Sequence, residues 1–290
     1  MLAVAVGLLI AANNVEEPLP PQARLADSLD AGIEWLHANR NDMLANENPI
    51  LWYFVHRSAE LADDPRLTAL VDAHRKKYID PELGTYVWEP MFNPDDPGLP
   101  LDFDAIVGLN HYSQHMLYAT NCSAEIGRLD SIQAQNEPGF CGPAHLFKPT
   151  CATHQLMGIR FLQRAECGDA DKNAATVREL QRMIRREITL DPRVLDAYIQ
   201  RALMLVESGD TAPVKGIWIR RILDQQRADG GWGNFQPLMA LSDKRFLGFG
   251  SGQSRARGSF LKVFRISRPT STFHATAQGV LLTALLVHGE

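Results

Sequence analysis

The chain has 290 residues, of which 45% are hydrophobic and 22% are charged, so it is long enough for one large globular domain or two small ones. Its net charge of −5 gives no overall attraction to nucleic acid or to an acidic membrane, and we expect no nucleic-acid partner. A P-loop, a dinucleotide glycine fingerprint and a Gly-x-Ser-x-Gly elbow are all absent from the sequence, which argues against nucleotide hydrolysis, NAD chemistry and α/β-hydrolase chemistry.

The first segment is an apolar run from Met1 to Ala12, about as long as the hydrophobic region of a secretory signal peptide and too short to span a bilayer. The next residues, Asn13 to Pro21, are rich in Asn, Glu and Pro, which suits a linker after a cleavage site. We therefore predict a signal peptide and linker over residues 1–21, export to the periplasm or the outside of the cell, and no stable membrane span. The alternative is a buried N-terminal helix.

Helical periodicity extends over most of the remaining chain, and strand alternation is nearly absent. The predicted helices cover 23–39, 48–63, 65–78, 103–120, 123–135, 151–166, 171–188, 192–208, 212–227 and 272–288. No Ser- or Gly-rich linker divides these segments, so we predict a single all-α domain over residues 22–290.

A repeated unit organises these helices. Pro149–His154 and Pro269–His274 each open an apolar helix, and each follows a matching prelude, at 133–140 and 225–232. A weaker third copy covers 77–104. Because single helix pairs cannot bury their apolar faces alone, repeated pairs stack on one another. The repeat predicts an α/α toroid, an incomplete barrel of about five helix pairs, with a ligand cavity at the rim where the inner helices begin.

The second copy carries a family resemblance. Gln225-x3-Asp229-Gly230-Gly231-Trp232-Gly233, followed by Ser271-x2-His274-x-Thr276, resembles repeats of the terpene-cyclase/protein-prenyltransferase toroid superfamily. The resemblance implies that Gln and Trp brace adjacent helices and that inner helices line the cavity. It also implies a zinc ligand at His274, which is similar to a histidine early in the last inner helix of protein prenyltransferases.

Acidic residues open the predicted helix at 103–120. Asp104, in Asp102-Phe103-Asp104, stands at a place similar to that of the general acid of class II terpene cyclases, which implies cyclase-like acid catalysis. The alternative is that both acids cap the helix and interact favourably with its dipole.

Histidines are the main candidates for chemistry. His154 and His274 occupy equivalent places in two repeats, so we expect both to face the cavity mouth as metal ligands or as general acid and base. His111 and His115 are four residues apart on one predicted helix, a spacing that can present both imidazoles to one zinc or other transition-metal ion. The alternatives are packing histidines in the repeats and a solvent-exposed pair at 111 and 115.

Four cysteines fall between residues 122 and 167, namely Cys122, Cys141, Cys151 and Cys167. In an exported protein they predict one or two disulfides, with Cys141–Cys151 as the simplest pair. The alternative is a zinc site from Cys141, His145, Cys151 and His154.

A basic, glycine-rich insertion separates Gln236 from Arg268. Its cations are Lys244, Arg245, Arg255, Arg257, Lys262, Arg265 and Arg268, against the single acid Asp243. We expect it to close over the cavity and to hold an anionic substrate through Arg255, Arg257, Lys262 and Arg265, with Trp232 beside them. The alternative is a solvated surface loop.

Together these patterns predict an exported toroid-fold enzyme that acts on a polar or anionic small substrate in the central cavity, with histidines as metal ligands or acid–base groups. One alternative is a non-catalytic ligand-binding or scaffold toroid. A further alternative is acid catalysis by Asp104.

Overall fold

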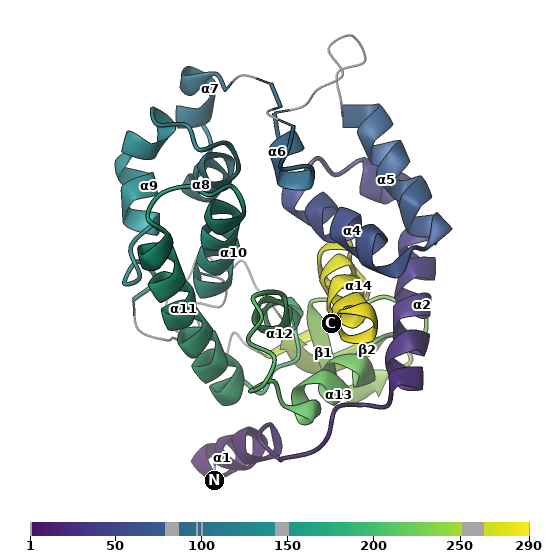
Figure 1. Cartoon of the computed structure of the whole chain (residues 1–290). Helices are drawn as coiled ribbons and strands as arrows, with labels where there is room; N and C mark the ends of the chain where they lie inside the picture. Colours follow the sequence, from purple (N-terminus) through teal and green to yellow (C-terminus); the bar gives the residue numbers. More distant parts are fainter. Residues whose placement is uncertain are drawn as a thin grey trace.

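The computed structural model in Figure 1 describes residues 2–78, 87–96, 98–99, 101–142, 151–250 and 264–289. These residues are mostly helical, as predicted, and carry one small sheet. The helices are α1 (Leu2–Ala12), α2 (Gln22–Ala38), α3 (Arg40–Leu44), α4 (Pro49–Ala62), α5 (Pro65–Tyr78), α6 (Glu89–Phe92), α7 (Phe103–Val107), α8 (His111–Asn121), a 3₁₀ turn at Ile126–Arg128, α9 (Asp130–Gln135), α10 (Cys151–Arg164), α11 (Ala170–Leu190), α12 (Asp196–Glu207), α13 (Gly216–Asp224) and α14 (Phe273–His288). The strands are β1 (Phe235–Ser242), β2 (Arg245–Gly250) and β3 (Phe264–Ser267).

Side-chain caps explain where several helices begin. The side chain of Asn48 accepts a hydrogen bond from the Ile50 N–H at the start of α4, and Asp169 caps α11 in the same way. The predicted helix at 103–120 is two helices, because the chain leaves helical geometry after Gly108 and Asn110 then caps α8. A strong capping residue inside an apolar pattern thus starts a new helix.

The helices form two groups. Figure 1 shows α7 to α11 on one side and α2, α4 and α5 on the other, with α12, α13 and α14 between them in the lower half. Helix α14 packs against α2, α4 and α12, and α10 packs against α8 and α11. The core between α2 and α14 is built around Trp232, which is fully buried. Its ring fits against Gly32 and Gly279, where an added Cβ atom would lie 3.0 and 2.6 Å from ring carbons.

The prediction of an all-α chain is wrong at residues 235–250 and 264–267. There, β1, β2 and β3 form an antiparallel sheet in that order, with Ser242 paired to Arg245 across a tight turn. The pairing of β1 with β2 shifts between Pro237 and Met239 and again between Ala240 and Ser242. Such irregularities break the two-residue alternation of a regular strand, which is why the sequence pattern concealed the sheet.

The predicted linker is fixed to the body at its first residue. Asn13 is fully buried, its Nδ2 donates to the Ile188 carbonyl at 2.7 Å, and its Oδ1 accepts from the Tyr198 hydroxyl at 2.8 Å. The Trp218 indole N–H also donates to the Asn13 carbonyl at 2.9 Å. Of the helices in the described ranges, none combines the length and the apolar character that crossing a bilayer requires.

Two disulfides join the four cysteines. Cys122 pairs with Cys167 and Cys141 with Cys151, with Cα–Cα distances of 5.7 and 5.6 Å. The expected Cys141–Cys151 pair is thus confirmed. Both thiols of the alternative zinc set are consumed in it, because a metal-binding thiolate cannot also be a disulfide sulfur.

Candidate active site

The repeated histidines lie in the first turns of α10 and α14. The His274 Nδ1 atom is 3.4 Å from an Asp196 carboxylate oxygen, and its Nε2 atom is 3.1 Å from the amide nitrogen of Gln278. His274 thus lies between a carboxylate and an amide, one on each ring nitrogen. The His154 ring packs edge-on against Tyr112, with centroids 4.4 Å apart. His274 thus lies beside a carboxylate, and His154 lies beside an aromatic ring.

His111 and His115 are not brought together as metal ligands. His111 is exposed at the first position of α8, while His115 is buried against Gly158 and its Nε2 lies 3.0 Å from the Asn136 side-chain oxygen. Burial lowers the pKa of His115 to about 4, so the ring is neutral near pH 7. Across the described part of the chain, no three His, Cys, Asp or Glu side chains are grouped to hold a metal ion.

The other predicted site residues have separate places. Asp104 is exposed in the first turn of α7, and its backbone N–H donates to the Asp102 side chain at 3.1 Å, so Asp102 is the cap. Trp232 is fully buried and its indole N–H donates to the Ile222 carbonyl, so its ring has no surface for a substrate. Arg265 is exposed on β3. Arg255, Arg257 and Lys262 lie outside the described residues.

A pocket of about 490 Å³ lies away from the helix starts that carry His154 and His274. It is formed mainly by residues of α4, α10 and α12. It is lined by Tyr53, His56, Arg57, Glu60, Phe92, Pro94, Met157, Arg160, Phe161, Gln163, Arg164, Met204 and Glu207. Its volume suits a small molecule. Its lining combines apolar side chains, such as Phe92, Phe161 and Met204, with a majority of polar and charged ones.

The floor of this pocket is a buried carboxyl group. One oxygen of Glu207 accepts a hydrogen bond from the Tyr53 hydroxyl at 2.7 Å, and the other oxygen is buried without a hydrogen-bond partner. Burial raises the pKa of Glu207 above its ordinary value and outweighs the Tyr53 hydrogen bond. Burial, together with the Glu207 carboxylate, raises the pKa of the Tyr53 hydroxyl, so the phenol keeps its proton. Glu207 is therefore a group that can carry or accept a proton inside the pocket.

Three arginines surround the carboxyl group without forming an ion pair with it. Arg164 lies over the Phe161 ring at 4.8 Å and donates to the Met91 carbonyl at 2.7 Å. Arg57 pairs with Glu60 at 2.7 Å, and Arg160 donates to the neutral Gln163 amide at 3.2 Å. The charges of all three lower the pKa of Glu207 in part, which places them within electrostatic reach of it. The pocket thus combines excess positive charge with one buried acid.

Two histidines lie in contact with each other at the pocket, and only His56 lines it. His56 lines the pocket, and its Nε2 atom is 3.1 Å from Nδ1 of His74, which stacks on Trp52 at 4.3 Å. Burial lowers the pKa of His56 to about 3 and that of His74 to about 4. Both rings are thus neutral near pH 7, and His56 serves as a hydrogen-bonding group rather than a cation.

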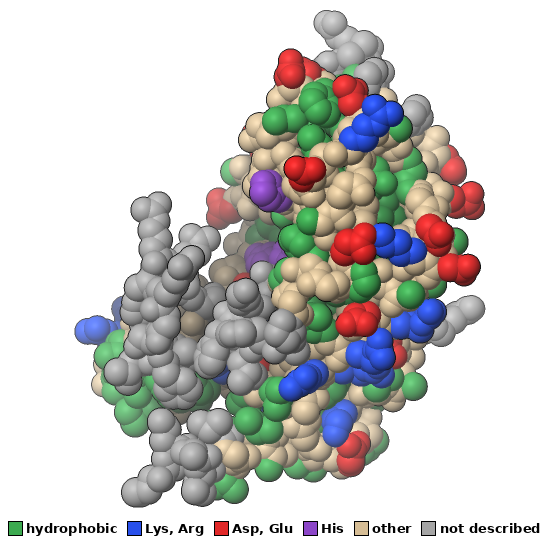
Figure 2. All heavy atoms as spheres, turned by 90° about the vertical axis from the view of Figure 1, so that its left-hand side faces the viewer, with side chains coloured by type: hydrophobic (Ala, Val, Ile, Leu, Met, Phe, Trp, Pro, Cys, Tyr) green, Lys and Arg blue, Asp and Glu red, His purple; other side chains and the backbone are tan. Residues whose placement is uncertain are grey.

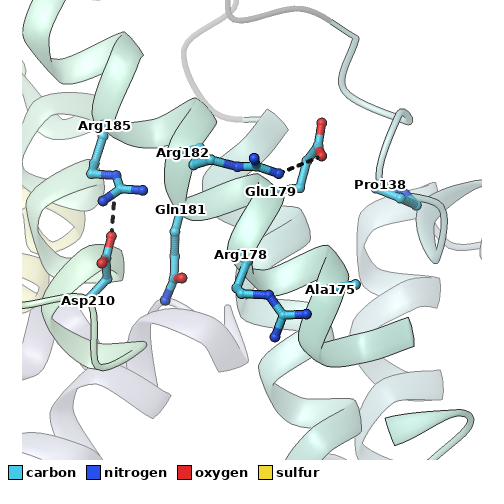
Figure 3. Close-up of a pocket in the computed structure, with 8 residues that line it drawn as sticks. All are labelled: Pro138, Ala175, Arg178, Glu179, Gln181, Arg182, Arg185 and Asp210. Atoms are coloured by element: carbon cyan, nitrogen blue, oxygen red, sulfur yellow. Dashed lines mark hydrogen bonds and ion pairs between the residues drawn. The ribbon is translucent and has the colours of Figure 1, made fainter. Parts of the chain in front are cut away.

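A second hollow, of about 530 Å³, lies over the outer helix α11 and is shown in Figure 3. Its cations are largely paired: Arg182 contacts Glu179 at 3.2 Å and Arg185 contacts Asp210 at 3.5 Å. Ion pairs at the surface contribute little energy. The pocket of Glu207 is therefore the better candidate for chemistry.

The sequence contained a weak signal for this pocket. Glu207 is the one acid that ends the apolar run Leu203–Val206, and Tyr53 stands in the equally apolar start of α4. Each alone resembles an ordinary helix residue. Compared with known proteins, the chain matches no family model, no curated protein and no solved structure.

Proposed function

We propose that the protein is an enzyme that binds a small anionic substrate in the pocket between α4, α10 and α12 and transfers a proton through Glu207. The observation that carries the proposal is the unpartnered buried oxygen of Glu207 in a pocket with three arginines. A buried polar atom without a partner is costly unless a ligand or water fills the position. The proposal keeps the predicted substrate class and assigns the acid–base role to a different residue.

The proposed mechanism divides the work between charge and proton transfer. Arg57 and Arg160, at the pocket wall, hold the substrate anion, because guanidinium groups bind carboxylate and phosphate oxygens through two parallel hydrogen bonds. Their charge lowers the free energy of further negative charge that develops beside the anion. Glu207 takes a proton from the substrate onto its free oxygen and returns it to another atom, since a raised pKa brings the group closer to neutral pH. Tyr53 holds the other oxygen in place.

We also propose that the helix pairs form an α/α toroid and that the protein is exported. Helix pairing such as α4 with α5 and α10 with α11 supports the toroid. The two disulfides support export, because such bonds persist in oxidising compartments.

The test begins with ligand binding by thermal shift and calorimetry, using small carboxylates, phosphate esters and neutral sugars as probes. We expect anionic compounds alone to raise the melting temperature, and the Arg57→Ala/Arg160→Ala double variant to lose that shift. Substrates are then sought among the compounds that bind. Glu207→Gln should keep the binding and reduce turnover by at least about 10²-fold.

Three outcomes would overturn parts of this proposal. Binding that ignores the arginine substitutions would place the ligand elsewhere. Anion binding without turnover of any bound compound would favour the non-catalytic alternative. If turnover survives Glu207→Gln and is lost in His274→Ala, the acid–base group is His274 and not Glu207.

The starts of α12 and α14 are a second candidate site, because two side-chain amides near them are buried and have polar atoms without hydrogen-bond partners. Gln200 lies one turn after Asp196 on α12, and neither of its side-chain polar atoms has a hydrogen-bond partner. Gln278 lies one turn after His274 on α14 and has an unpartnered side-chain oxygen. These groups support a polar ligand beside His274 and Asp196, and the His274→Ala arm of the experiment tests it.

A further inference from the structure

The three-stranded sheet exposes several large hydrophobic side chains on its two faces. We call the apolar sheet surface the set of Leu238, Met239, Leu241, Phe264 and Ile266, which are 37% to 52% exposed. Phe235 and Phe249 of the same sheet are buried, and Phe249 pairs with Phe264 across β2 and β3. Clustered exposed hydrophobic residues of this size indicate a binding surface, because a monomer gains no stability from leaving them in water.

Both faces of the sheet are exposed at its free end. Met239 and Ala240 are consecutive paired residues of β1, so they point to opposite faces, and both are exposed. The same holds for Phe264, Arg265 and Ile266 along β3. A folded protein partner would cover one face of a projecting sheet. A lipid layer into which the sheet dips would cover both.

Cations border the apolar sheet surface. Lys244, Arg245, Arg265 and Arg268 are all exposed, and none of the four is in an ion pair with a described residue. The single acid beside them is Asp243, although the whole chain carries a net charge of −5. Figure 2 shows a small group of hydrophobic side chains with a cationic side chain beside it at the lower left, next to residues drawn in grey. Apolar residues near cations that have no ion pair with a described residue complement a surface that is apolar inside and anionic outside.

We propose that the sheet docks the protein on a bilayer that contains anionic lipids. The apolar sheet surface enters the boundary between headgroups and acyl chains, and the four cations contact lipid phosphates. Each Lys or Arg near an anionic surface adds to such binding, and partly buried apolar side chains add more. The contact is peripheral, since the helices of the described residues do not cross a bilayer.

Vesicle flotation of the full chain tests this proposal. The probes are vesicles of phosphatidylcholine alone and of phosphatidylcholine mixed with phosphatidylglycerol. We expect the protein to float with the mixed vesicles only, and added salt to weaken the binding. The double variant Arg245→Glu/Arg265→Glu should lower the partition coefficient at least about tenfold. Leu241→Asp should lower it by a similar factor, and because both changes are at exposed positions the circular dichroism and melting temperature should be unchanged.

Two matched variants serve as controls. Arg182→Glu makes the same kind of charge change on α11, and Leu19→Asp changes a leucine that is 49% exposed, against 48% for Leu241. Both controls should bind vesicles as the unmodified protein does. The proposal fails if the unmodified protein binds neither vesicle or binds both equally, or if the controls lose as much binding as the sheet variants. It also fails if analytical ultracentrifugation shows a dimer that Leu241→Asp dissociates, because the surface would then be occupied by a second copy.

Discussion

Arg201 and Glu207 are two ionisable side chains of helix α12, and their surroundings are opposite. Arg201 is fully buried and contacts the Glu187 carboxylate at 3.1 Å and the Asp191 carboxylate at 3.0 Å. Glu207 lines a pocket and has one hydroxyl partner, and its other oxygen is buried without a hydrogen-bond partner. A buried charge that has several ion pairs holds helices together. A buried ionisable group at a cavity that has only one hydrogen bond is available to a ligand.

The two sites also differ in the direction of their pKa shifts. Burial alone would raise the pKa of Asp191, but hydrogen bonds and ion pairs with Arg193 and Arg201 lower it below its ordinary value. Burial raises the pKa of Glu207, and no ion pair reverses the shift. The protein thus stabilises the charged form of one carboxyl group and the neutral form of the other.

The largest effect that separates the two sites is expected from Arg201→Ala. It leaves two buried carboxylates without their shared cation, and we expect a loss of about 3–5 kcal/mol in the free energy of unfolding. Urea denaturation measures it. Arg193→Ala is the matched control, since Arg193 also contacts Asp191 but is partly exposed, and it should cost clearly less. A loss of under about 1 kcal/mol for Arg201→Ala would show that the cluster does not hold α11 to α12.

A smaller effect is expected from Tyr53→Phe. The change removes the hydrogen bond to Glu207, a bond to an ionisable group that contributes about 1.5–3 kcal/mol, and nothing else in the side chain changes. The free energy of unfolding should decrease by an amount in that range at neutral pH. The decrease should be smaller under acid conditions, where Glu207 is neutral. Equal losses at both pH values would mean that Glu207 is neutral throughout.

The pH dependence of stability should have opposite signs at the two sites. Because folded Glu207 holds its proton to a higher pH than the unfolded chain does, its contribution to stability is lost as the pH rises from 4.5 through the raised pKa, by about 1.4 kcal/mol per pKa unit. The contribution of Asp191 is present above 3.8 and is lost as the pH falls through its lowered pKa.

Urea titrations over a pH series, with Glu207→Gln and Asp191→Asn, measure the two contributions. The difference between the unmodified protein and Glu207→Gln should change most on the alkaline side of the ordinary carboxyl pKa, and that for Asp191→Asn on the acidic side. Parallel curves for the two variants would remove the contrast between the sites.

The smallest effect is expected from His274→Ala. The His274 side chain is 36% exposed, so its contact with Asp196 is screened by water and should contribute less than about 1 kcal/mol. Thermal denaturation measures it. Anion binding in the pocket of Glu207 should be unchanged, and a large loss of stability would instead make the repeated histidine a main support of the fold.

Local features of the fold were predictable, and long-range ones were not. Helices such as α4, α5 and α14 follow from periodicity and capping residues close in sequence. The sheet was missed because irregular pairing in β1 hides its alternation. The positions of His154 and His274 at helix starts were predicted correctly, because a helix start depends on neighbouring residues.

The candidate pocket could not be predicted because its parts come from distant segments. Tyr53 and Glu207 are 154 residues apart, and each becomes informative only when folding places it beside the other. The spacing of His111 and His115 predicted a shared face, but it contained no information that Asn136 and Gly158 would enclose one of the two rings.

The contacts of Asn13 have a consequence for how the chain can be matured. A peptidase that cuts after Ala12 would leave Asn13 as the new first residue, with its side chain and carbonyl still bound to α11, α12 and α13. A cut one bond later would strip the Tyr198 hydroxyl and the Trp218 indole of their buried partners, at about 1–3 kcal/mol for each group. The buried contacts of Asn13 thus predict that a chain shortened to begin at Asn13 keeps these bonds, whereas one that begins at Asn14 is less stable.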